Sequence, residues 1–242
     1  MDAKEFAAAY GEAFGPAAGL PLLFWYSEEP VRTVPKTEGC FFKALGEACE
    51  GLPVSLNAGN IGCGGGKFYT GFAPMPPFVP TFVSQKEHYK QTPGMVLEFI
   101  GRLGIPEASG AWLNFARIDT DAGIEVFGRA EGVLFFATPD VLSGLVSWAV
   151  YDNNADDAVC APFGSGCSAV VTQAVRENRR GGRSVFLALF DPSVRPWVDA
   201  SELGFVAPMS RLREMCGTMR ASCLFGTHAW NKVRVRINGG NI

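Results

Sequence analysis

The segment Ser184–Phe190 is almost uniformly apolar, and it limits the folds open to this chain more than any other stretch. A strand with apolar side chains on both sides is typical of a sheet that is covered on both faces. Other strand-like runs are interspersed with stretches of helical periodicity, without a strict alternation of strand and helix. The sequence therefore predicts one globular domain over residues 1–242, of the α/β or α+β class, with a mixed sheet and packed helices.

Apolar periodicity, glycine and proline set the expected elements. Helices are expected at residues 2–14, 40–51, 92–103, 139–151, 167–180 and 209–219. Strands are expected at residues 21–26, 54–56, 112–118, 132–137, 184–190 and 203–207. Lys232–Ile237 alternates charged and apolar residues, which predicts a final edge strand. The C-terminal part, residues 209–242, is thus expected to be a helix followed by that strand.

Composition and charge exclude several classes of function. The formal net charge is −3, so the chain has no basic footprint for nucleic acid or for an anionic membrane. No apolar stretch approaches the length of a membrane span. The N-terminal sequence Met1–Glu5 is acidic where an export signal would be basic, which predicts a cytoplasmic protein. The seven cysteines, odd in number and irregularly spaced, are then expected to be reduced thiols. The oligomeric state stays open.

Two cysteines lie in glycine-dense turns, Cys63 within Gly59–Lys67 and Cys167 within Gly164–Ser168. Glycines remove side chains and bring bare backbone N–H groups close to whatever the sulfur contacts. This setting predicts a ligand-binding site, with backbone or hydroxyl contacts from the neighbouring residues. Those residues are Gly62, Gly64, Gly65, Gly166 and Ser168.

Three cysteines mark junctions between a loop and a regular element: Cys40, Cys63 and Cys167. Three thiolates with an open fourth position suit an iron–sulfur cluster or another thiophilic metal, and Cys160 is a candidate fourth ligand. No Cys-x-x-Cys pair occurs, so the spacing of a zinc ribbon or a ferredoxin is absent. The leading hypothesis is therefore a metal or iron–sulfur site of unfamiliar spacing.

Two alternatives to the metal site remain open. Cys40 and Cys167 each begin an expected helix, whose positive end lowers the pKa of a thiol, and Cys167 or Cys63 is a candidate nucleophile of a thiol-dependent enzyme. The third hypothesis is a non-catalytic protein that binds a small organic ligand in an aromatic pocket. Its apolar walls would come from the many phenylalanines and from the proline-rich segment 71–83. The sequences around Lys67 match neither a Walker A loop nor a dinucleotide fingerprint.

The cysteine segments, taken in order, resemble the uncharacterised domain-of-unknown-function 169 family, also called ArCR. The resemblance covers about residues 17–215 and rests on four segments: Leu22 to Pro30, Cys40 to Leu45, Cys63 to Gly65, and Gly166 to Phe186. The chain departs from the family pattern at Gly64, where proline often follows the cysteine, and in having Cys160 and a distinctive tail after Cys216. The resemblance draws attention to these cysteines, and it implies no activity and no cofactor.

Overall fold

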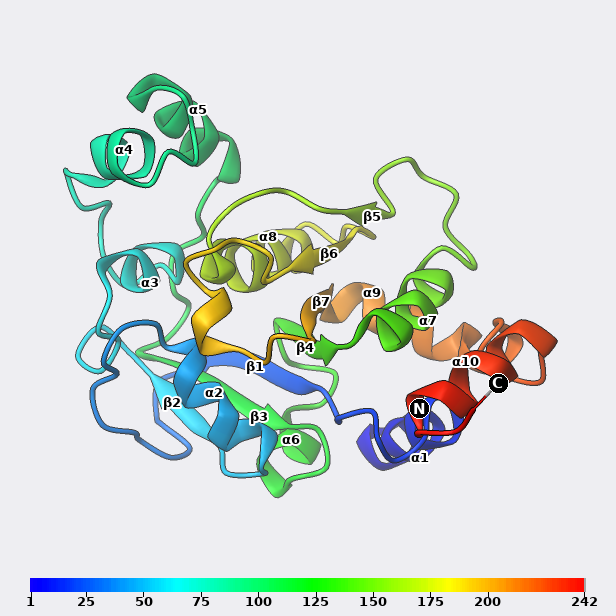
Figure 1. Ribbon diagram of the computed structural model, residues 1–242. Coiled ribbons are helices and arrows are strands. Elements are labelled where there is room, and N and C mark those ends of the chain that lie inside the picture. The colour runs from blue at the N-terminus through cyan, green and yellow to red at the C-terminus, as the bar shows by residue number, and fades with distance from the viewer. Residues whose placement is uncertain (242) are drawn as a thin grey trace.

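The computed structural model describes residues 1–241, and these form a mixed sheet of seven strands (Figure 1). The strand order is β2-β3-β1-β4-β7-β6-β5, and every neighbouring pair is antiparallel except β5 and β6. The predicted mixed sheet is therefore confirmed. The strands are β1 (Leu22–Ser27), β2 (Val54–Leu56), β3 (Trp112–Arg117), β4 (Gly132–Ala137), β5 (Val159–Cys160), β6 (Val185–Ala188) and β7 (Leu203–Pro208).

Helices pack on both faces of this sheet. The α-helices are α1 (Ala3–Phe14), α2 (Phe42–Cys49), α3 (Gly64–Tyr69), α4 (Val79–Thr81), α5 (Pro93–Leu103), α6 (Asp121–Val126), α7 (Pro139–Ala149), α8 (Gln173–Arg179), α9 (Met209–Thr218) and α10 (His228–Ile237). The π-helical segments are η1 (Phe82–Lys86) and η2 (Ser168–Thr172), and the 3₁₀ turns are η3 (Arg195–Trp197) and η4 (Met219–Ala221).

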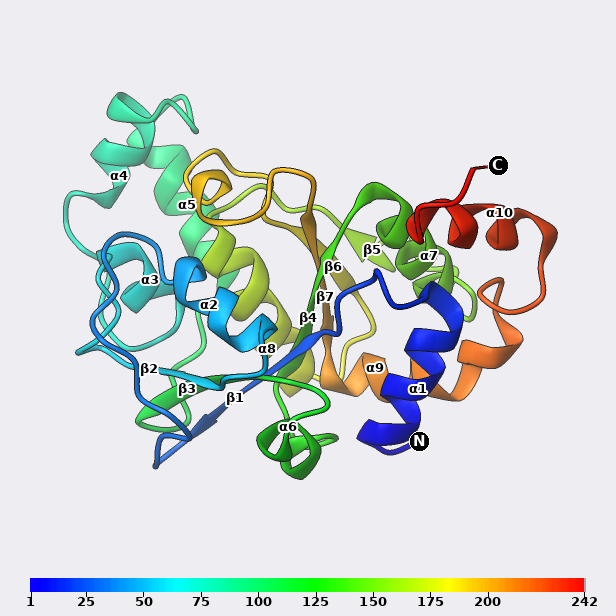
Figure 2. The ribbon, with the colours of Figure 1, turned by 60° about the horizontal axis from the view of Figure 1, so that its bottom comes forward.

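Two apolar cores lie on opposite faces of the sheet, because successive strand residues alternate between them. In β4, Val133 and Phe135 belong to one core and Leu134 to the other. The first core holds α1, α7, α9 and α10, and the second holds α2, α3, η2 and α8. Figure 2 shows the sheet between these two groups of helices. The apolar segment around β6 predicted a strand that is buried on both faces of the sheet. The structure confirms this, because residues of β6 belong to both cores.

The chain between α3 and β3 projects from the body, at the upper left of Figure 1. We call residues 73–105 the lobe; it contains α4, η1 and α5, which pack mainly on one another. Thr92 caps α5 by accepting a hydrogen bond from the Met95 N–H. At the end of α5, the Arg176 guanidinium on α8 donates to the carbonyls of Arg102 and Leu103, which ties the lobe back to the body.

The predicted edge strand Lys232–Ile237 is wrong, because these residues belong to helix α10. Thr227 caps this helix by accepting a hydrogen bond from the Trp230 N–H. Trp230 is buried, and Val233 and Ile237 pack against the same core at helical spacing. The apolar residues of this segment therefore form one stripe along a helix, although they alternate with charged residues in the sequence. Residue 242, the last in the predicted domain, lies outside the described residues.

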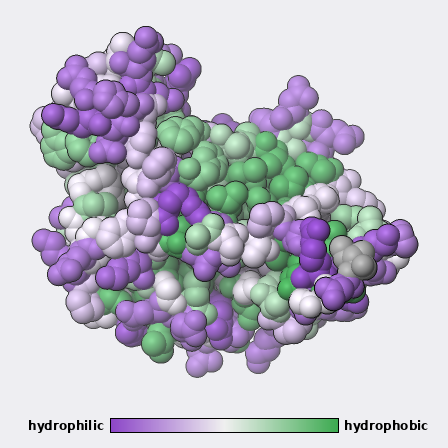
Figure 3. Space-filling model, in the orientation of Figure 1, coloured by the Kyte–Doolittle hydropathy of each residue, from purple (hydrophilic) through white to green (hydrophobic). Residues whose placement is uncertain are grey.

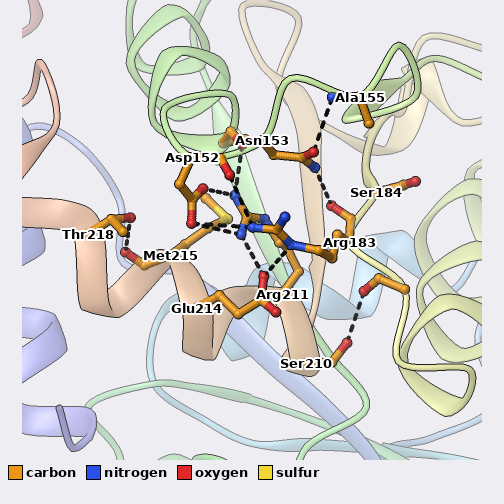
Figure 4. Close-up of polar contacts among 12 residues, drawn as sticks. Asp152, Asn153, Ala155, Arg183, Ser184, Ser210, Arg211, Glu214, Met215 and Thr218 are labelled. Carbon is orange, nitrogen blue, oxygen red and sulfur yellow. Dashed lines mark hydrogen bonds and ion pairs between the residues drawn. The ribbon is translucent and has the colours of Figure 1, made fainter.

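A network of charged side chains joins α7, α9 and the start of β6 (Figure 4). The side chain of Arg211 is fully buried and donates to the Glu214 carboxylate at 2.7 Å, to the Ala149 carbonyl at 2.9 Å, and to Asp152. Arg183 also donates to Glu214, at 2.7 Å. The hydrogen bond from Arg211 holds the pKa of Asp152 below its ordinary value of 3.8.

Across residues 1–241, none of the helices is both long enough and apolar enough to span a bilayer.

Candidate functional site: an apolar cavity beside three cysteines

A cavity of about 410 Å³ lies where the lobe meets the body of the protein. Its lobe side includes the rings of Phe78, Phe82 and Phe99. Its body side includes Cys63, Gly64, Gly65, Tyr69, Phe163 and Ser165. Figure 3 shows apolar residues gathered on the surface beside the lobe, over β5 and β6, but none of the residues that line the cavity belongs to these two strands. The walls therefore combine one continuous segment of chain with segments that are distant in sequence.

Local irregularities of the backbone surround this cavity. Segment η1 carries Phe82 into the wall, and η2 follows Cys167 directly. Single π-helical turns are found frequently at functional sites. Among the described residues, the two non-glycine residues with positive φ are His88 at 53° and Leu189 at 66°. Each lies within two residues of the cavity wall, and for a bulky residue such as Leu189 this conformation is strained.

Cys63 is placed by the first turn of α3. Its sulfur accepts a hydrogen bond from the Gly66 N–H at 3.1 Å. A Cβ atom at Gly66 would lie 2.8 Å from that sulfur, so only glycine leaves room for it. The far end of α3 is fixed as well, because the Thr172 hydroxyl donates to the Tyr69 carbonyl at 2.6 Å. Cys63 and Tyr69 therefore face the cavity from a short helix held at both ends.

The fold brings together the thiols of Cys40, Cys63 and Cys167, which are far apart in sequence. Burial raises the pKa of Cys40 to about 12, and the nearby Cys63 and Asp191 raise it further. Burial also raises the pKa of Cys167, with added contributions from Cys40, Cys63 and Asp191, against a lowering hydrogen bond from Ser165. The Ser165 hydroxyl lies 3.3 Å from the Cys167 sulfur and also lines the cavity.

These pKa directions correct the expectation that a helix start lowers the pKa of Cys40 and Cys167. Burial outweighs the helix start at both thiols. Cys167 is only 7% exposed, and the half-buried Cys40 keeps a raised pKa although the backbone N–H groups of Phe41 and Phe42 lower it. The raised pKa of each thiol disfavours the thiolate that a nucleophilic cysteine needs. Of the three thiols, Cys63 is the one in the cavity wall.

Of the glycines expected at the site, two line the cavity and two do not. Gly64 and Gly65 line the cavity. Gly62 instead serves a close backbone approach, because a Cβ atom there would lie 1.9 Å from the Thr37 carbonyl oxygen. Gly166 packs against Val194, which a Cβ atom would approach to 2.9 Å.

Ser168 and Cys160 also lie away from the cavity wall. Ser168 is buried, and its hydroxyl donates to the Ser165 carbonyl at 2.8 Å. Cys160 is on β5, where its thiol donates to the Asp157 carbonyl at 3.3 Å. Burial raises the pKa of Cys160, and the negative charges of Asp157 and Glu177 raise it further. The charged neighbours of Cys160 therefore differ from those of Cys40 and Cys167.

Asp191 is the acidic residue at this site that sequence reasoning missed. It lines the cavity, is 2% exposed and raises the pKa of Cys40 and Cys167. Its Oδ1 atom accepts hydrogen bonds from the N–H group of Ser193, at 3.1 Å, and from the hydroxyl of the same residue. The available signal was its position directly after the apolar segment Ser184–Phe190, since polar groups at strand ends often form sites.

The thiols are neighbours, but they are not arranged as a finished metal site. Within residues 1–241, no group of three or more histidine, cysteine, aspartate or glutamate side chains has the geometry to hold a metal ion. Coordination by the three thiols would therefore require movement of their side chains, together with release of thiol protons on metal binding.

The fold and the site define an α/β protein with an apolar cavity bordered by thiols and one buried carboxylate. Residues 22–218 match the family described as uncharacterised ArCR, domain of unknown function 169, and the chain belongs to this family. The resemblance predicted from the four segments is thereby confirmed, with bounds close to those expected. Searches of curated proteins and of solved structures found no match to the chain.

Proposed function

We propose that the protein binds a small, largely apolar organic molecule in the cavity between the lobe and the body. The observation that carries this proposal is the aromatic wall, in which six rings surround a space of about 410 Å³. That volume lies within the range of about 300–1,000 Å³ found for small-molecule pockets. The six rings belong to Tyr69, Phe78, Phe82, Tyr89, Phe99 and Phe163.

The exposed rings of the lobe support the same proposal. Phe78 is 60% exposed and Phe82 is 44% exposed, and the two rings meet edge to face at 6.2 Å. On the opposite wall, Phe163 is 37% exposed and its ring contacts that of Tyr89 at 5.9 Å. Large apolar groups gathered at one opening mark binding sites, because a ligand that covers them removes apolar surface from water.

The proposal predicts that filling the cavity weakens binding without unfolding the protein. Gly65 lines the cavity, and a Cβ atom there meets only the Tyr69 ring, at 3.9 Å. We expect Gly65→Phe to weaken the binding of the neutral fluorescent probe 1-N-phenylnaphthylamine at least about tenfold, which corresponds to about 1.4 kcal/mol. Fluorescence titration measures this affinity, and thermal unfolding verifies that each variant is folded.

The matched control is Gly65→Ala, which adds one methyl group and leaves the cavity open. Its affinity for the probe should equal that of the original chain. Equal affinity of Gly65→Phe and Gly65→Ala would show that the probe binds elsewhere. Absence of saturable binding to the original chain would contradict the proposal directly.

A second candidate function is favoured by the proximity of Cys40, Cys63 and Cys167. Thiol sulfurs prefer soft metals and iron–sulfur clusters, and a bound metal drives off thiol protons that burial otherwise retains. In this hypothesis the three cysteines hold a thiophilic metal or a cluster at the edge of the cavity. Cys160 joins them only if its segment moves, because Cys160 lies on β5 and its thiol donates a hydrogen bond to the carbonyl of Asp157, which precedes that strand.

This second candidate predicts iron with inorganic sulfide, or about one equivalent of a soft metal, in protein purified without oxygen. Metal analysis and the visible absorption spectrum measure the bound group, and titration with Cd²⁺ tests the metal-free protein. We expect Cys63→Ala to lose the group and Cys160→Ala to retain it. Colourless protein that neither contains metal nor takes up Cd²⁺ would exclude this candidate.

A further inference from the structure

Asp191 is a buried acid whose hydrogen bonding is incomplete. Its Oδ1 atom accepts from Ser193, whereas Oδ2 has no hydrogen-bond partner within residues 1–241. The N–H groups of Gly166 and Val194 are near enough to lower the pKa of Asp191, although neither makes a hydrogen bond of acceptable geometry to Oδ2. A buried carboxylate oxygen without a partner is unfavourable, so a donor from a ligand would be strongly stabilised there.

The protein supplies little positive charge to this carboxylate. Burial raises its pKa, and the groups that oppose this shift are hydroxyl and backbone N–H donors, which carry no net charge. Among the neighbouring cysteines, burial raises the pKa of Cys40 and of Cys167, which favours their uncharged forms. Within residues 1–241, Asp191 therefore lacks the cationic partner that buried carboxylates usually have.

The charge and the rings of the cavity wall also favour a cation. Two carboxylates line it, Asp191 and Glu87, against the single ammonium of Lys90. That ammonium already lies over the Phe99 ring, 5.3 Å from its centroid. The faces of aromatic rings attract cations, most strongly where water is excluded. The wall is therefore suited to a ligand that joins an apolar body to one positively charged donor.

We infer that the ligand class of this cavity is a primary amine with an apolar body, whose ammonium donates a hydrogen bond to Oδ2 of Asp191. The inference rests on the proposed function and specifies its ligand. The apolar body occupies the space between the rings of the lobe and those of the body. The ammonium lies at the inner wall beside Ser193, and Glu87 contributes its charge from an exposed position.

Competition with 1-N-phenylnaphthylamine tests the inference. The competitors are 4-phenylbutylamine and its neutral counterpart 4-phenylbutan-1-ol, in buffer containing a metal chelator. We expect the amine to displace the probe at a concentration at least about tenfold lower than the alcohol, because a charge-assisted hydrogen bond is stronger than a neutral one. In Asp191→Asn this preference should disappear, while the affinity for the neutral probe stays the same.

Glu98→Gln is the control for loss of one negative charge, since Glu98 is exposed on α5 of the lobe and lies outside the cavity wall. It should retain most of the preference for the amine. Equal displacement by amine and alcohol in the original chain overturns the inference, and this comparison needs no variant to fold. Preference retained in Asp191→Asn, or lost in Glu98→Gln, overturns it also. If the probe binds without any preference for the amine, the proposed function stands and only the inference fails.

Discussion

Replacement of Arg211 by alanine is expected to lower the free energy of unfolding by about 2–4 kcal/mol. The buried guanidinium donates to Asp152, Glu214 and the Ala149 carbonyl, and all three lose a donor at once. Removal of the side chain also leaves an unfilled space in the core. The expected loss is below that of a fully buried ion pair, because both carboxylates reach solvent. Urea unfolding measures it.

The control is Arg213→Ala on the same helix, where the side chain is exposed, and this variant should unfold within about 0.5 kcal/mol of the original chain. The loss in Arg211→Ala should also depend on pH. Arg211 holds the folded pKa of Asp152 below 3.8, so its contribution is complete above that value and is lost as the pH falls further. A loss under 1 kcal/mol at neutral pH would show that the network contributes little.

The second large effect is expected from Gly144→Ala, a change that normally stabilises a helix. Gly144 lies within α7, and a Cβ atom there would be 2.2 Å from the Trp230 ring and 2.9 Å from the Phe14 ring. Trp230 cannot retreat freely, because its Nε1 donates to the Ala13 carbonyl at 2.9 Å. We expect overpacking to lower the free energy of unfolding by about 2–3 kcal/mol, measured by chemical denaturation.

Gly11→Ala provides the matched control in α1, where nothing lies within 4 Å of the added methyl group. This variant should be more stable by about 0.5–1 kcal/mol, since alanine is the better helix former. Opposite signs for the two substitutions would establish that α7, α10 and α1 are in contact in solution. A stabilising Gly144→Ala would contradict the packing of Trp230 against α7.

The sequence allowed the layered sheet to be predicted because its apolar patterns are local. Phe6, Tyr10 and Phe14 recur every four residues and are fully buried along α1. The apolar segment around β6 predicted that both faces of the sheet are covered, and an apolar core does lie on each face. The prediction of a strand at Lys232–Ile237 was wrong, because an alternation of charged and apolar residues over so short a stretch is also compatible with a helix. The deciding residue, Trp230, lies outside the alternating stretch and acts through tertiary packing.

The candidate site could be predicted only in part. Glycine-rich surroundings identified Cys63 and Cys167, and the fold brings both near Cys40. Segment 71–83, which the third hypothesis placed in the walls of an aromatic pocket, contributes Phe78 and Phe82 to the cavity. The position of the cavity could not be predicted, because its outer wall exists only once the lobe folds against the body. Asp191 was missed for a related reason. Its importance comes from its burial and from the unpartnered Oδ2 atom, and the residues next to it in the sequence predict neither property.

The division of the cavity between two kinds of wall has an evolutionary consequence. One wall is a single stretch of chain that packs mainly on itself, and the other is built from scattered segments that also support the sheet. Substitutions in the lobe can therefore change the size and shape of an accepted molecule while the scaffold is conserved. Changes near Gly66 or Gly166 would disturb the core instead. Relatives with this fold are expected to diversify in the lobe and to retain the thiol-bearing side.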